Sequence, residues 1–135
     1  MKADKIDQEI EIPKGVNVDI KGKDVTVKGS KGEITRHLDN PKVKMTKKDD
    51  KVLLESVKPS KKEKAVLNTY VKHIMNMIKG VEEPFVYEMA ICSSHFPMNV
   101  TANKDEVIVK NFLGEKHPRT MKVDEGVTVK VNDKT

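Results

Sequence analysis

The sequence SKKEKAVLNTYVKHIMNMIKG, at residues 60–80, carries the clearest structural signal in the chain. It opens with a Ser-x-x-Glu pattern, in which the Ser60 hydroxyl can accept a first-turn N–H and the Glu63 carboxylate can accept the N–H of Ser60. Apolar residues then recur at steps of three and four, which places them on one helical face: Leu67, Tyr70, Val71, Ile74 and Ile78. Gly80 follows Lys79 as a typical C-cap. We therefore expect an amphipathic helix over 60–80.

The residues before this helix alternate between apolar and polar side chains. The alternating runs are short, and turns rich in glycine, lysine or aspartate separate them: 10–12, 16–20, 25–27, 34–38, 43–45 and 52–54. A period of two is typical of strands in an antiparallel sheet with one solvated face. The sequence therefore predicts an α+β fold, in which residues 8–83 form one sheet and the helix covers one of its faces.

The residues after the helix repeat part of this plan. Apolar runs predict further strands at 85–92, 98–102, 107–109, 121–123 and 127–129. Their motifs follow the order of the first set, so that Pro13, Val25-x-Val27 and Gly32-Glu33 correspond to Pro97, Val107-x-Val109 and Gly114-Glu115. The spacing from Val-x-Val to Gly-Glu is the same in both copies, which indicates an internal duplication.

The duplication predicts two similar small domains, at 1–83 and 84–135, each an antiparallel sheet with one covering helix. The second copy contains no counterpart of the last strand or the helix of the first. We therefore expect domain 84–135 to be truncated before those elements. An incomplete unit of this kind would leave an open sheet edge and an uncovered apolar face.

Composition points to a moderately basic protein that meets a polyanion. The net charge is +5, from 26 basic and 21 acidic residues, and only Arg36 and Arg119 are arginines. Lysine suits single contacts to phosphate better than bidentate reading of base edges. Cys92 is the one cysteine, which excludes an intrachain disulfide and fits a reducing cytoplasm. We expect Cys92 itself to be a small apolar residue of the core. No apolar stretch resembles a secretory signal or is long enough to cross a bilayer.

Three runs together resemble a known family. Residues 68–81, NTYVKHIMNMIKGV, are similar to the helix that ends the first domain of the L-six family of large-ribosomal-subunit proteins. Residues 94–100, SHFPMNV, resemble the start of that family's second domain. The run NFLGEK at 111–116, followed by Arg119, is similar to the archaeal and eukaryotic branch in particular. The resemblance extends along essentially the whole chain in the expected order.

The resemblance implies a structural, non-enzymatic protein of the large ribosomal subunit with two similar α+β domains. It implies binding to large-subunit ribosomal RNA near the sarcin–ricin loop and the factor-binding region, contact with neighbouring ribosomal proteins, and a cytoplasmic, ribosome-bound location. It implies no cofactor, no small-molecule substrate and no membrane. Members of the family continue into a basic C-terminal tail that contacts RNA, and this chain departs from them by ending earlier.

Two groups of residues are candidate RNA contacts. The first lies in and before the loop around Gly114, where backbone can approach RNA closely and side chains can donate to phosphate and ribose oxygens: Ser94, His95, Lys110, Asn111, Lys116, His117 and Arg119. The second is a stripe on the polar face of the helix: Lys72, His73, Asn76 and Lys79. The alternatives are a solvated hairpin with incidental charges and the ordinary wet face of an amphipathic helix.

Other chemistry finds little support. The four histidines, at 37, 73, 95 and 117, form no close pairs, whereas zinc ligands are usually tightly paired. Cys92 and Ser93 are adjacent, so they would point to opposite sides of a strand, and no glycine elbow surrounds them. We therefore expect no metal site and no enzyme. The alternative function is a protein–protein interaction module that uses an open sheet edge.

Overall fold

The computed structural model describes residues 4–132, and it divides into two compact units, Met1–Val86 and Tyr87–Thr135. The described residues form three small antiparallel sheets and one long helix, so the expected α+β class is confirmed. We call Met1–Val86 unit 1 and Tyr87–Thr135 unit 2, and describe each by itself.

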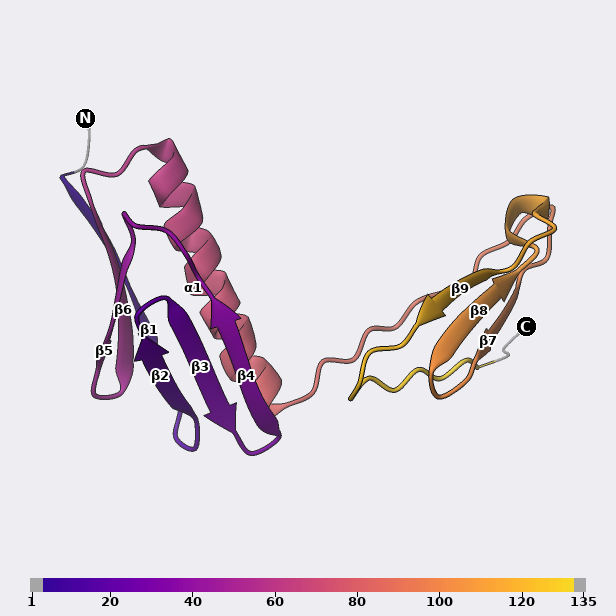
Figure 1. Ribbon diagram of the computed structural model, residues 1–135, viewed down its shortest axis with the longest axis horizontal. Helices are drawn as coiled ribbons and strands as arrows, with labels where there is room; N and C mark the ends of the chain where they lie inside the picture. The colour runs from indigo at the N-terminus through magenta and orange to yellow at the C-terminus, as the bar shows by residue number, and fades with distance from the viewer. Residues whose placement is uncertain (1–3, 133–135) are drawn as a thin grey trace. The chain divides into compact units, whose positions relative to one another are not determined.

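Unit 1 contains six strands. They are β1 (Lys5–Glu11), β2 (Asn17–Lys21), β3 (Asp24–Gly29), β4 (Gly32–His37), β5 (Lys44–Lys48) and β6 (Lys51–Val57). Hydrogen bonds divide them into two three-stranded sheets, ordered β1-β6-β5 and β2-β3-β4, so the expectation of one sheet was wrong (Figure 1). The separation follows from the connection after β1. Pro13 cannot donate to a ladder, and the chain turns there and pairs β2 with β3, while β1 pairs with β6.

The expected helix is present as α1 (Lys61–Glu82), with Ser60 as its N-cap. The capping box forms as expected: the Ser60 hydroxyl accepts from the Lys62 N–H at 3.2 Å, and Glu63 accepts from the Ser60 N–H at 2.7 Å. The expectation that Gly80 ends the helix was wrong, because the helix continues to Glu82. The continuation buries Val81, which is only 1% exposed, and its carbonyl accepts from the Lys31 N–H at 2.9 Å.

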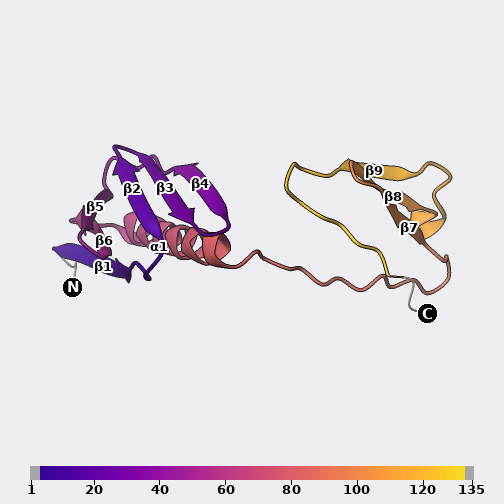
Figure 2. The same cartoon turned by 90° about the horizontal axis from the view of Figure 1, so that it is seen from below.

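The core of unit 1 lies between α1 and the sheets. Figures 1 and 2 show the helix along one face of β2, β3 and β4. Leu67 and Ile74 of α1 are fully buried, as are Val25 and Val27 of β3. A Cβ at Gly29 would lie 2.6 Å from Val81 Cγ2, so only glycine lets β3 approach the end of α1 this closely. This contact fixes the C-terminal turns of the helix against the β3–β4 turn.

Unit 2 holds one three-stranded sheet. Its strands are β7 (Asn99–Ala102), β8 (Glu106–Lys110) and β9 (Arg119–Lys122), ordered β7-β8-β9, with a short 3-10 turn, η1 (Phe112–Gly114), before β9. The two Val-x-Val motifs therefore both lie on the central strand of a three-stranded antiparallel sheet, β3 in unit 1 and β8 in unit 2. That the two sheets superpose stays a prediction.

The strands expected at 85–92 and 127–129 and the core position expected for Cys92 were wrong, whereas the expected uncovered apolar face is present. Residues 85–92 and 127–129 form no strand and belong to none of the three sheets. Cys92 is exposed rather than part of a core. No side chain between residues 87 and 132 is fully buried, so the apolar face of β8 has no covering helix among the described residues.

Candidate nucleic-acid interface

The loop between β8 and β9 is longer than its counterpart in unit 1. Val27 of β3 pairs with Ile34, seven positions on, whereas Val109 of β8 pairs with Arg119, ten positions on. The additional residues produce η1 and the exposed turn that contains Lys116 and His117. The β8–β9 hairpin therefore has a longer, exposed loop at the candidate RNA-contact site.

Two contacts tie this loop to the segment before β7. The Asn111 side-chain amide donates to the Pro97 carbonyl at 3.0 Å. Gly114 has a φ of 81°, and a Cβ there would lie 3.1 Å from the Phe96 ring. The Phe96 ring also meets the His95 ring edge-on, with centroids 5.9 Å apart. The structure thus brings two of the candidate regions together, residues 94–97 and residues 110–119.

Arg119 is held inside the loop. Its Nε donates to Glu115 at 2.8 Å, its Nη2 donates to the other carboxylate oxygen at 2.6 Å, and the guanidinium lies 4.3 Å from the centroid of the Phe112 ring. The ion pair lowers the pKa of the Glu115 carboxyl. One edge of the fork is therefore occupied, and a phosphate would have to meet the Nη1 side, where guanidinium N–H groups remain.

Three other basic side chains of the loop region are more accessible. Lys110, Lys116 and His117 are exposed, and within residues 4–132 their side chains make no hydrogen bond or ion pair. Ser94 and His95 are exposed in the irregular segment before β7. These side chains can donate to phosphate or ribose oxygens without first breaking an internal contact.

Leu113 is a feature of the loop that the sequence analysis missed. Its side chain is 72% exposed and its φ is 49°, a left-handed conformation that is strained for leucine. An exposed apolar side chain on strained backbone is a common feature of contact sites. The only sequence signal for Leu113 was its place beside Gly114 in the run NFLGEK, residues 111–116, which resembles the L-six family.

The second candidate group lies on α1 in unit 1. Lys72, Asn76 and Lys79 are exposed, and His73 is half-buried beside them. The five lysines of α1 make no ion pair with any residue between 4 and 132. Glu63, the acidic residue of the first turn, pairs instead with Lys42, which lies outside the helix, at 3.1 Å. The stripe is therefore a solvated basic face.

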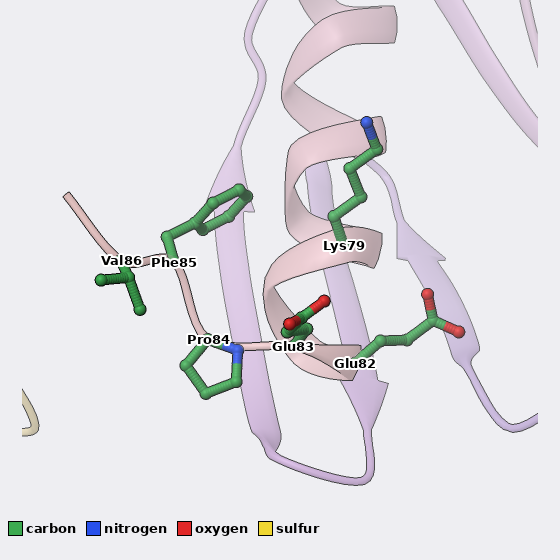
Figure 3. Close-up of a pocket in the computed structure, with 6 residues that line it drawn as sticks. All are labelled: Lys79, Glu82, Glu83, Pro84, Phe85 and Val86. Carbon is green, nitrogen blue, oxygen red and sulfur yellow. The ribbon is translucent and has the colours of Figure 1, made fainter. Parts of the chain in front are cut away.

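A shallow depression of about 490 Å³ lies at the C-terminal end of α1 (Figure 3). It is lined by Lys79, Glu82, Glu83, Pro84, Phe85 and Val86. The Phe85 ring lies over Gly80, 3.1 Å from the position of a Cβ there. Two carboxylates on its wall disfavour phosphate, so Lys79 is the one lining residue that stays a candidate RNA contact.

Two other kinds of site are absent from the described part of the chain. No group of three or more His, Cys, Asp or Glu residues between 4 and 132 could hold a metal ion. No helix in that range has the length and apolar character needed to span a membrane.

Comparison with known proteins decides the family. The model of the family described as Ribosomal protein L6 matches residues 12–83 and 96–135. This chain belongs to the ribosomal protein L6 family. Large ribosomal subunit protein uL6 of Methanococcus vannielii is 50% identical over 127 residues, which cover 94% of this chain and 70% of that protein. The uL6 protein of Methanobrevibacter smithii is 52% identical over 118 residues, which cover 87% of this chain and 66% of that protein.

Membership in the ribosomal protein L6 family confirms the resemblance drawn from the three runs. Proteins of this family are structural components of the ribosome and not enzymes, so the expectation of a non-enzymatic protein is also confirmed. The two segments that match the L6 model lie on either side of residues 84–95. The candidate RNA contacts of this chain stay predictions.

Proposed function

We propose that this chain is a structural, RNA-binding protein of the large ribosomal subunit. The observation that carries the proposal is identity of about half to two archaeal large-subunit proteins over 94% and 87% of the chain. The finer part of the proposal is the place of binding: large-subunit ribosomal RNA near the sarcin–ricin loop and the factor-binding region. The protein would be ribosome-bound in the cytoplasm, beside other ribosomal proteins.

The mode of binding would be positioning without turnover. The β8–β9 loop is anchored through Asn111 and Gly114, so it meets RNA with little loss of conformational freedom. Lys116 and His117 extend from this rigid base and can contact phosphate and ribose. Contacts of this kind recognise RNA shape and backbone rather than base sequence.

A second function is favoured by the exposed apolar side chains of unit 2. Met121 of β9 is 62% exposed and Val127 is 56% exposed, and β7 and β9 are the edge strands of their sheet. An edge strand beside exposed apolar side chains can accept a strand from a partner protein. This reading makes unit 2 a protein–protein interaction module.

Co-sedimentation separates the two functions. The 135-residue chain is mixed with large subunits depleted of their own uL6 and centrifuged through a sucrose gradient, with and without added large-subunit ribosomal RNA as competitor. RNA binding predicts co-sedimentation that free RNA competes away. Co-sedimentation that free RNA leaves unchanged would favour the protein–protein module, and absence from the subunit fraction would contradict the proposed function.

A further inference from the structure

The distribution of charge in unit 1 is uneven and centres on α1. Residues 1–83 carry 19 basic and 14 acidic side chains, whereas residues 84–135 carry seven of each. The helix itself has five lysines and two glutamates. The rest of residues 1–83 is therefore close to balance, with 14 basic and 12 acidic side chains. Most of the excess positive charge of the chain lies on one helix.

Ion pairing sharpens this contrast. Several lysines of the strands pair with neighbouring carboxylates, as Lys5 does with Glu55 at 2.6 Å and Lys51 with Glu9 at 3.1 Å, whereas the lysines of β5 make no ion pair within residues 4–132. The α1 lysines have no such partner between residues 4 and 132. From Lys64 to Val81 the helix contains no acidic residue at all. A solvated helix is normally stabilised by Glu–Lys pairs four residues apart, and α1 contains no such ion pair.

The positions of three lysines form a straight row. Lys61, Lys72 and Lys79 are separated by eleven and seven residues, close to three and two turns of an α-helix, so they lie above one another on the exposed face. The row is about 27 Å long at a rise of 1.5 Å per residue. Figure 3 shows the Lys79 side chain running along the helix, away from the carboxylates of Glu82 and Glu83.

The neighbours of the row suit a nucleic-acid backbone. Asn68 and Asn76 are exposed beside it and can donate to phosphate or ribose oxygens. Lys61 also lies in the first turn, where a cation is disfavoured by the helix dipole. The placement therefore costs stability and is explained by an anionic partner rather than by the fold.

We propose that the row Lys61–Lys72–Lys79 on α1 is the main phosphate-contacting surface of this chain, and that it binds the backbone of large-subunit ribosomal RNA. The inference rests on the proposed function and deepens it. The β8–β9 loop then contributes shape and anchoring, since unit 2 has no excess positive charge and Arg119 is held by Glu115. A continuous polyanion matches a row of point charges on one line.

The test is a salt series with three variants of the 135-residue chain. The probe is protein-free large-subunit ribosomal RNA, and the dissociation constant is measured against salt concentration. In the first variant Lys61→Gln, Lys72→Gln and Lys79→Gln are combined, because glutamine keeps helix propensity while removing charge. Loss of three phosphate contacts should lower the slope of log affinity against log salt by about 2 to 3.

Two matched variants serve as controls. Lys14→Gln, Lys44→Gln and Lys48→Gln remove the same charge from exposed lysines outside α1, and this variant should keep the slope of the unaltered chain. Lys61→Arg, Lys72→Arg and Lys79→Arg keep the charge and should also keep the slope. Circular dichroism checks that the helix persists in each.

Each outcome bears on one claim. An unchanged slope in the α1 glutamine variant, or an equal loss in the Lys14 control, overturns the assignment to α1 while the proposed function stands. Unchanged RNA binding with lost co-sedimentation would assign the row to an acidic protein and also overturn it. If the unaltered chain does not bind the RNA, the proposed function itself fails.

Discussion

Ser56 places a hydroxyl in the core of unit 1. Its side chain is 1% exposed, and Oγ has no hydrogen-bond partner among the described atoms, while Val52 and Leu54 on the same face of β6 are fully buried. A buried hydroxyl without a partner costs about 1–3 kcal/mol. We expect Ser56→Ala to raise the free energy of unfolding by about 1 kcal/mol, measured by urea denaturation. The exposed Ser30→Ala is the control, and a loss of stability in Ser56→Ala would contradict the assignment.

The loop cations allow a comparison between a free and a bound side chain. Lys116 makes no hydrogen bond or ion pair with residues 4–132, whereas Arg119 is bound by Glu115 and lies against Phe112. If Lys116 contacts phosphate, Lys116→Ala should lower the salt slope of ribosomal RNA binding by about 0.7–0.9 and leave stability unchanged. Arg119→Ala should weaken binding as well, partly by loosening the loop.

Glu115→Gln separates the two roles of Arg119. The substitution removes the ion pair but keeps the guanidinium, so binding should strengthen if the freed fork meets phosphate, and weaken if the pair mainly shapes the loop. Wild-type affinity and slope in both Lys116→Ala and Arg119→Ala would show that this loop does not contact the RNA.

Prediction of single residues from the sequence succeeded where local chemistry sets a residue's role. It failed where that role depends on a contact with another residue of the fold. The sequence alone identified Gly114 as a position for close approach, and the structure gives it a positive φ and a close Phe96 ring. It did not reveal that Glu115 occupies one edge of Arg119, because two charged residues four apart pair reliably only inside a helix. Leu113 and Ser56 were missed, since exposure and burial depend on tertiary packing.

At the scale of elements, the start of α1 is sensitive to acid. Hydrogen bonds from Ser60 and then from Lys42 lower the pKa of Glu63 from 4.5 to about 2. A carboxyl with a lowered folded-state pKa contributes stability that is fully present above its unfolded pKa and is lost as pH falls through the folded value. The contribution of Glu63 should therefore decline between about pH 4.5 and pH 2.

The measurement is the free energy of unfolding against pH for the unaltered chain and for Glu63→Gln. The difference between the two should be constant near neutral pH and should shrink across this window. Ser60→Ala should cost about 1 kcal/mol at pH 7 through loss of the cap. A constant difference down to pH 2 would mean that Glu63 is not the titrating group.

The elements show why α1 could be predicted and some strands could not. The Ser-x-x-Glu pattern and the apolar stripe are local signals, and both appear in the structure. The end of the helix was misjudged because Val81 is held by Gly29, a contact with a residue far away in sequence. Residues 85–92 have the composition of a strand, yet a strand needs a partner to form its ladder. Pattern alone cannot supply that partner.

At the scale of the whole molecule, the two units differ in how their folds are maintained. All buried apolar side chains of the described residues, from Ile10 to Val81, lie in unit 1. In unit 2 the strands β7-β8-β9 have the same order as β2-β3-β4 in unit 1. Among the described residues no helix covers Val107 and Val109, which stay half-buried. The two sheets share this strand order but have unequal cores.

This inequality predicts unequal stability. A three-stranded sheet without a covered apolar face is marginal in water, whereas α1 packed on two sheets gives unit 1 a closed core. We expect a fragment of residues 1–86 to keep the helical circular dichroism of the whole chain and to unfold cooperatively at nearly the same urea concentration. A fragment of residues 87–135 should show no cooperative transition, and its amides should exchange rapidly in the whole chain. Slow exchange at Val107–Val109, or cooperative unfolding of the isolated fragment, would mean that the sheet of unit 2 is stable without a covering element.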